Sequence, residues 1–126
     1  MSIDGQQLAG APDDKGTIDI ARPFAGCYVL TPHGEIDAYS APELRDHVIE
    51  ALASGEVTRL VVDLTRATFL DSSALGVLVG ALKRMRERHG RLDVVSPPAG
   101  VRRIFEITNL DRVLDLHDTL GAALEP

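Results

Sequence analysis

Hydrophobic residues follow two different periods along this chain, and the change from one to the other predicts alternating strands and helices. The segments 17–21, 27–31 and 59–65 are rich in β-branched and aliphatic residues, as strands are. Turn residues at 22–26 separate the first two segments, which predicts an opening β-hairpin. The continuous apolar run 60–62 is typical of a strand buried on both faces of a sheet.

A first helix is expected to begin after Ser40. The sequence Ser40-Ala-Pro-Glu43 has the form of a capping box, in which the serine hydroxyl accepts from a backbone N–H and the glutamate reciprocates. The apolar positions that follow share one helical face: Leu44, Val48, Ala51 and Leu52. Residues 54–55 end this pattern and therefore the helix.

A second helix is expected to begin after Asp71 and to stop at Gly90. Its apolar stripe consists of Leu75, Leu78, Val79 and Leu82. Its C-terminal part is strongly basic, with Lys83, Arg84, Arg86 and Arg88, and these cations complement the negative end of the helix dipole. The strand predicted at 91–95 then completes a right-handed βαβ crossover with the strand at 59–65, and the two strands run parallel.

The C-terminal part of the chain predicts three short elements. A third helix after Pro98 would bury Val101, Ile104 and Phe105 and end at Asn109, which tolerates a left-handed cap. A last strand is expected at 113–116. Asp118 is expected to cap a short final helix that contains Leu120 and Leu124. Residues 32–34 are expected to break the second strand, and 66–70 to form a link.

These elements predict a single α/β domain with a mixed sheet of about five strands and about four helices. The chain has 126 residues, which suits one domain. Residues 1–16 show neither period and predict a mobile N-terminal tail, which leaves 17–126 as the folded domain. The composition, 44% hydrophobic and 25% charged, excludes a fully disordered or collagen-like chain.

Charge and cysteine usage narrow the function classes. The net charge of −6 has the wrong sign for a surface that attracts nucleic acid everywhere, although the basic run 83–91 leaves a local basic patch open. The single Cys27 excludes an intrachain disulfide and a Cys-rich zinc site and is expected to be a small packed residue. The longest apolar stretch, 74–82, is far shorter than the roughly 20 residues that span a bilayer. We expect a cytoplasmic protein without a membrane segment.

The candidate chemistry lies at 69–73, because ligands and partners of parallel sheets are met where strands end and helices begin. Asp71 is suited to cap the second helix by accepting from the N–H of Ser73 or Ala74. Ser72 would then keep its hydroxyl available. A phosphate on Ser72 would be favoured by the helix dipole and disfavoured by Asp71, each by about 1 kcal/mol, so the fold should tolerate it. The same residues could also do no more than cap the helix.

Three sequence blocks together resemble one known family. They are Asp71-Ser-Ser-Ala-Leu-Gly-Val-Leu-Val preceded by Leu60-Val-Val-Asp-Leu, then Gly34-Glu-Ile-Asp37, and Ser96-Pro-Pro-Ala-Gly-Val-Arg-Arg-Ile-Phe105 followed by Asn109-Leu110. The resemblance is to the STAS domain family, and in particular to the bacterial anti-sigma-factor antagonists. It covers 17–124 in register.

The resemblance implies a binding switch rather than an enzyme. In that family the unmodified protein binds an anti-sigma factor that is also an ATP-dependent serine kinase, and so releases the sigma factor. The resemblance places phosphorylation by this kinase on Ser72, with reversal by a PP2C-type phosphatase. It places Asp37, Asp71, Ser73 and Ala74 with Ser72 on the partner-binding surface. Relatives often have glycine at position 74. No cofactor and no metal are implied.

Other functions are weighed against this one. Residues 70–74 do not form a Gly-x-Ser-x-Gly elbow, and none of the histidines, His33, His47, His89 and His117, belongs to a local catalytic or metal motif. Helix-dipole compensation accounts for the first four cations of the basic run without nucleic acid, and aromatic residues, which could stack on bases, are few. A non-phosphorylated STAS module in another regulatory assembly, or a weak nucleotide-binding domain, remains an alternative.

Overall fold

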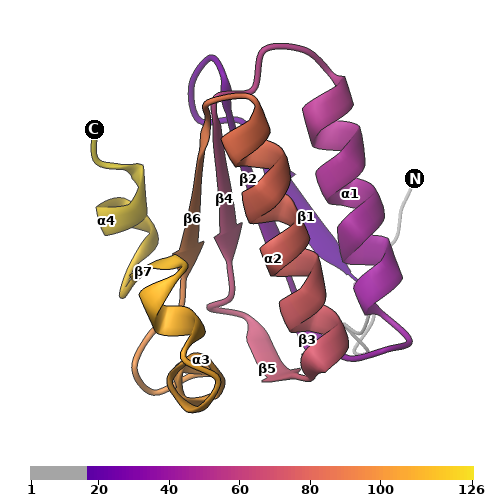
Figure 1. The fold of residues 1–126 in the computed structure, drawn as a ribbon, viewed down its shortest axis with the longest axis vertical. Coiled ribbons are helices and arrows are strands. Elements are labelled where there is room, and N and C mark those ends of the chain that lie inside the picture. The colour runs from indigo at the N-terminus through magenta and orange to yellow at the C-terminus, as the bar shows by residue number, and fades with distance from the viewer. Residues whose placement is uncertain (1–16) are drawn as a thin grey trace, which may run out of the picture.

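The computed structural model describes residues 17–126, so the N-terminal segment expected to be a mobile tail lies outside the described residues. The central feature is a five-stranded sheet in the order β1-β2-β4-β6-β7 (Figure 1). Its strands are β1 (Ile18–Ala21), β2 (Cys27–Pro32), β4 (Arg59–Asp63), β6 (Arg91–Val95) and β7 (Asp115–His117). Strands β1 and β2 pair antiparallel and the other neighbours pair parallel. The predicted opening hairpin and the parallel β4–β6 pair are confirmed.

A second, two-stranded parallel sheet was not predicted. It pairs β3 (Gly34–Ile36), which begins at the end of the expected break at 32–34, with β5 (Ala67–Leu70), in the segment expected to be a link. Gly34 adopts a positive φ of 76°, and its N–H donates to the carbonyl of Arg66, which brings the two segments together. Strands of three and four residues that are half exposed carry too little hydrophobic pattern to be recognised.

Helices cover the two faces of the central sheet unequally. On one face lie α1 (Ala41–Ala53) and α2 (Ser72–Glu87), with α3 (Arg102–Ile107) beside them (Figure 1). A 3₁₀ turn (Leu110–Arg112) follows α3. The main core lies under these helices and includes Leu30, Leu60, Val62, Val94 and Phe105. Successive strand residues point to opposite faces, so Cys27, Val29, Val61 and Val95 face the other side, where α4 (Leu120–Leu124) packs on them.

Two predicted helix caps are wrong. Ser40 precedes α1, but its hydroxyl donates to the carbonyl of Glu35 and forms no cap hydrogen bond. The side chain is committed to the β3–α1 loop, so the capping box does not form. At α4 the cap is Thr119, whose hydroxyl accepts from the N–H of Ala122, whereas Asp118 forms an ion pair with Arg102. The left-handed conformation predicted at Asn109 is confirmed, with φ 61°.

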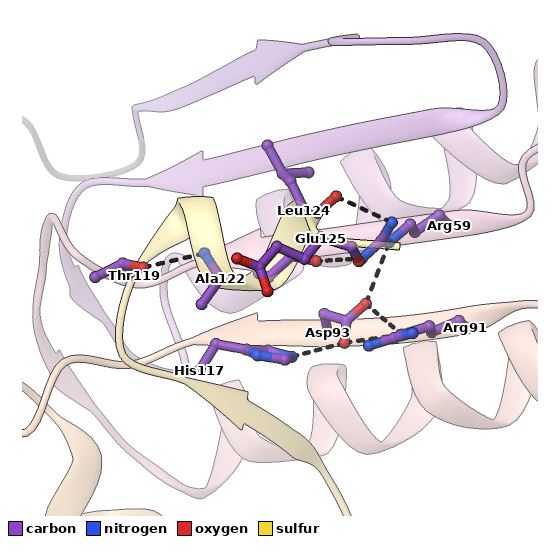
Figure 2. Close-up of polar contacts among 9 residues, drawn as sticks. Arg59, Arg91, Asp93, His117, Thr119, Ala122, Leu124 and Glu125 are labelled. Atoms are coloured by element: carbon purple, nitrogen blue, oxygen red, sulfur yellow. Dashed lines mark hydrogen bonds and ion pairs between the residues drawn. The ribbon is translucent and has the colours of Figure 1, made fainter.

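A buried ionic cluster lies under the C-terminal helix (Figure 2). Asp93 is completely buried, and its carboxylate accepts from Arg91 Nε at 2.8 Å and lies 2.8 Å from His117 Nε2. Arg59 Nε lies 3.5 Å from Asp93 Oδ2, an ion-pair distance rather than a hydrogen bond. The other guanidinium nitrogens of Arg59 donate to the carbonyl oxygens of residues 123–125. One arginine therefore joins β4 and the buried carboxylate to the end of α4.

Candidate functional site

The carboxylate of Asp71 connects two segments of the chain. It precedes α2, and its Oδ1 accepts from the N–H of Ser73 at 2.8 Å and of Ala74 at 3.2 Å, as predicted for a helix cap. Its Oδ2 accepts from the N–H of Ala38 at 3.0 Å, in the loop between β3 and α1. Both carboxylate oxygens are therefore occupied by backbone N–H groups from two different elements.

Ser72 is the first residue of α2 and is exposed. Within residues 17–126 its hydroxyl forms no hydrogen bond, because the cap interactions are made by Asp71. Ser73 is half-buried. The methyl group of Ala74 is buried in the main core, so Ala74 faces the sheet and contributes its N–H to the cap. Of the three residues that follow Asp71, Ser72 is therefore the one most open to an enzyme or partner.

Asp37 shapes the loop that lies against Asp71. Its Oδ1 accepts from the N–H of Tyr39 at 3.0 Å and of Ser40 at 3.1 Å, a turn in which an aspartate mimics backbone. Asp37 itself is half-buried. The turn directs the N–H of Ala38 to Asp71, so the structure brings the 37–40 loop and the start of α2 together, two segments that the sequence analysis assigned to one surface.

Two exposed aromatic side chains lie near this site: Phe69 belongs to the predicted segment 69–73, whereas Tyr39 was missed in the sequence analysis. Tyr39 lies in the loop that contacts Asp71 and is 85% exposed, and Phe69 lies in β5, two residues before Asp71, and is 49% exposed. Aromatic residues are enriched at protein interfaces because they provide large apolar contacts. The sequence could not show that Phe69 is exposed. Phe69 is an apolar residue beside Leu70, and their strand is too short for the hydrophobic pattern to show which side chain faces the solvent.

The STAS domain family model matches residues 21–123. The chain belongs to the STAS domain family.

Relatives of this STAS domain share one description. The anti-sigma-B factor antagonist of Listeria monocytogenes is 38% identical over 88 residues, which are 70% of this chain and 76% of that relative. The crystal structure of an anti-sigma factor antagonist from Mycobacterium paratuberculosis has a TM-score of 0.75 at 30% identity, and the match covers 92% of this chain and 96% of that one.

The Bacillus antagonist SpoIIAA has solved structures in an unphosphorylated and a phosphorylated form. They match with TM-scores of 0.66 and 0.67 at 21% and 22% identity. The matches cover 84% and 86% of this chain and 92% and 96% of the SpoIIAA chains. At this level of identity the likeness shows the fold alone. The mixed sheet and four helices predicted for the chain are those of a STAS fold, and the family resemblance is confirmed.

The basic run of the STAS domain has internal partners that the sequence did not reveal. The Arg88 guanidinium donates to the carbonyl of Leu52 at 3.1 Å and of Val57 at 3.4 Å, at and just beyond the C-terminal end of α1. Arg91 pairs with Asp93. Arg88, one of the four cations predicted to complement the helix dipole, therefore joins the end of α2 to the end of α1, whereas Arg91 pairs within β6.

The histidines of the STAS domain lie in other environments. His33 Nε2 is 2.8 Å from Asp19, His47 Nδ1 is 2.8 Å from the carbonyl of Glu43, and His117 contacts Asp93. Across the part of the chain that the structure describes, no histidine hydrogen-bonds Ser72. Residues 17–126 also contain no group of three or more His, Cys, Asp or Glu side chains arranged to hold a metal ion.

Cys27 is buried on β2, as expected for a small packed residue. Burial raises the pKa of its thiol, an effect that the nearby positive charge of Arg59 partly offsets and the negative charge of Asp93 reinforces. Among the described helices, none combines the length and the apolar character that crossing a membrane requires.

Proposed function

We propose that this STAS domain is an anti-sigma factor antagonist, and that its unphosphorylated form binds an anti-sigma factor and frees the sigma factor. Support comes from relatives described as anti-sigma factor antagonists at up to 38% identity. The observation that carries the proposal is the exposed Ser72 hydroxyl at the start of α2, beside the Asp71–Ala38 contact. The activity is binding, and the domain is not an enzyme.

Phosphorylation of Ser72 switches the binding off through charge. A phosphoserine adds about −1.5 to −2 charges, and burying this group at a docked surface without a basic partner carries a large desolvation penalty. Asp71 adds a like charge next to it. The cap of α2 uses Asp71 and not the Ser72 hydroxyl, so modification leaves the cap hydrogen bonds in place. The phosphate therefore changes what docks rather than how the chain folds.

The partners follow from the family role. The anti-sigma factor is itself the serine kinase that uses ATP, and a PP2C-type phosphatase restores the binding form. Asp37, Asp71, Ser72, Ser73 and Ala74 form the partner-binding site, in which Ala74 acts through its N–H because its side chain is buried. The domain acts in the cytoplasm, without direct contact to nucleic acid or membrane.

Mass mapping of the protein from its native cells tests the switch, with and without phosphatase treatment. We expect one phosphate, on Ser72, that phosphatase removes. A Ser72→Ala bait should recover an anti-sigma factor and resist its kinase activity, and Ser73→Ala serves as the matched control that should still be phosphorylated. An unmodified Ser72 under every growth condition would instead identify a constitutive interaction module. Phosphate on Ser73 alone would move the site.

A further inference from the structure

A groove lies between β5 and α3, next to the start of α2. Figure 1 shows α3 on one side of β5 and the first turn of α2 on the other. The groove has a volume of about 310 Å³, and its lining includes Phe69, Leu70, Val101, Arg103, Ile104 and Ile107. Phe69 of the groove lies three residues before Ser72 along the chain, so the groove is a neighbour of the proposed phosphorylation site.

Two large apolar side chains on the walls of the groove are exposed. Phe69 is 49% exposed and Ile107 is 64% exposed, and they lie on the two elements that form its walls. Large apolar side chains gathered at the rim of a groove mark a protein-interaction surface more often than scattered single residues do. Tyr39, in the loop whose Ala38 contacts Asp71, is a further exposed aromatic side chain near the Ser72 site.

The charges of α3 are divided between its two sides. Arg102 and Glu106 line a separate cavity with His117 and Asp115, and Arg102 forms an ion pair with Asp118. Arg103 and Ile107, which are four residues apart, line the groove instead. Arg103 is the one charged side chain in its lining, and within residues 17–126 it has no acidic partner. An apolar groove with one such cation is complementary to an apolar segment that carries a carboxylate.

The size of a typical protein interface also favours a partner that covers this groove. A stable protein complex buries about 800 Å² on each partner, which is 20 to 30 residues, and its energy is concentrated in a few large central side chains. The Ser72 site consists of two short segments, 37–40 and 71–74, and supplies only part of such a surface. The neighbouring groove provides the apolar area that these segments lack.

We propose that the β5–α3 groove is the second half of the partner-binding surface. It seats an amphipathic segment of the anti-sigma factor, whose apolar side chains contact Phe69 and Ile107 and whose carboxylate pairs with Arg103. The inference rests on the proposed function. It assigns the two halves different tasks: the groove supplies affinity that does not depend on modification, and the Ser72 half decides whether the complex can close.

The test measures the dissociation constant of the anti-sigma factor recovered with the Ser72→Ala bait, by titration calorimetry of the purified proteins. Ile107→Ser and Arg103→Glu should each weaken binding at least tenfold, as central interface residues do. Ile49→Ser and Arg86→Glu are matched controls, because they make the same changes at exposed positions of α1 and of the last turn of α2. These should bind as the unmodified protein does, and thermal melts confirm that each variant is folded.

The outcomes separate the two proposals. Weak binding by Ser72→Asp together with unchanged binding by Ile107→Ser and Arg103→Glu would overturn the groove and leave the switch intact. Equal weakening by the groove variants and their controls would also overturn the groove. If the Ser72→Ala bait recovers no anti-sigma factor, or if Ser72→Asp binds it as tightly as serine does, the proposed function itself fails and the groove assignment with it. Restoration of Arg103→Glu binding by a charge-reversed partner would identify the pairing carboxylate.

Discussion

The Oδ2 oxygen of Asp71 accepts a hydrogen bond from the N–H of Ala38, a residue 33 positions earlier in the chain. The same carboxylate caps α2 through its other oxygen. The position of the 37–40 loop and the first turn of α2 are thereby fixed by one side chain. A change at Asp71 acts on the stability of the helix and on the shape of the proposed partner surface together.

Replacing Asp71 by alanine should lower the free energy of unfolding by about 2 kcal/mol. The lost helix cap contributes about 1 kcal/mol and the lost bond to Ala38 about as much. Asp71→Asn keeps an acceptor and caps helices well, so it should cost less than half of this. Urea denaturation measures both, with Asp46→Ala on the exposed side of α1 as control. Amide exchange of Ala38 should be faster in Asp71→Ala, and an unchanged rate would show that the loop does not depend on Asp71.

Charge at Ser72 should leave the fold almost unchanged. We expect Ser72→Asp and the phosphorylated protein to unfold within about 1 kcal/mol of the unmodified protein, because dipole attraction and repulsion by Asp71 oppose each other. Thermal unfolding with circular dichroism at low and high salt measures this. Ser73→Asp, at a half-buried position, provides a comparison and should destabilise more. Loss of cooperative unfolding in Ser72→Asp would contradict a switch that acts only through docking.

Arg59 should hold the C-terminal helix closed. Arg59→Lys keeps a positive charge near Asp93 but cannot donate to all three carbonyls of residues 123–125, so α4 should open more often. Cys27 lies beneath α4 and reports this opening, because its thiol reacts with disulfide reagents only when uncovered. We expect labelling at least tenfold faster than in the unmodified protein and in an Arg86→Lys control, in the absence of urea. Equal rates would show that packing alone holds α4.

The stability of the domain should fall at alkaline pH because of Cys27. Burial raises its pKa in the folded state above the ordinary value of 9.0. Between that value and the folded-state pKa, the unfolded chain loses the proton and the folded chain keeps it, so the free energy of unfolding decreases as pH rises. Below pH 9.0 the contribution is constant. Urea denaturation from pH 8 to 10.5 should show a smaller decrease of the free energy of unfolding in Cys27→Ala than in the unmodified protein. The two proteins share every other titratable group, so the difference reports on Cys27.

The structural features that could be predicted from the sequence are those whose contacts lie close together along the chain. The long helices and buried strands follow from hydrophobic period, and the Asp71 cap follows from residue type and position, because these contacts lie within four residues. The same reasoning fails at Ser40. There a sequence of the right form is diverted by a carbonyl in the preceding strand, which local pattern does not describe.

Long-range contacts escape the sequence for a related reason. The pairing of β3 with β5 and the Asp71–Ala38 bond require the position of segments more than 30 residues apart. The exposed sides of Phe69 and Ile107 could not be assigned, because both are apolar residues in elements too short to show a face. The residues expected at the phosphorylation site came from the family resemblance, because physical reasoning from the residues alone favoured a simple helix cap.

The cluster around Asp93 makes the effect of a mutation depend on which mutations preceded it. Asp93 is completely buried among Arg59, Arg91 and His117, so its loss in the present sequence leaves two arginines facing each other without a counter-charge. In a chain in which both arginines and His117 were already apolar, the same loss would remove an isolated buried charge and would stabilise the fold. The loss of Asp93 is thus destabilising or stabilising according to which residues surround it. This part of the sheet can change only along paths in which the charges are exchanged as a group.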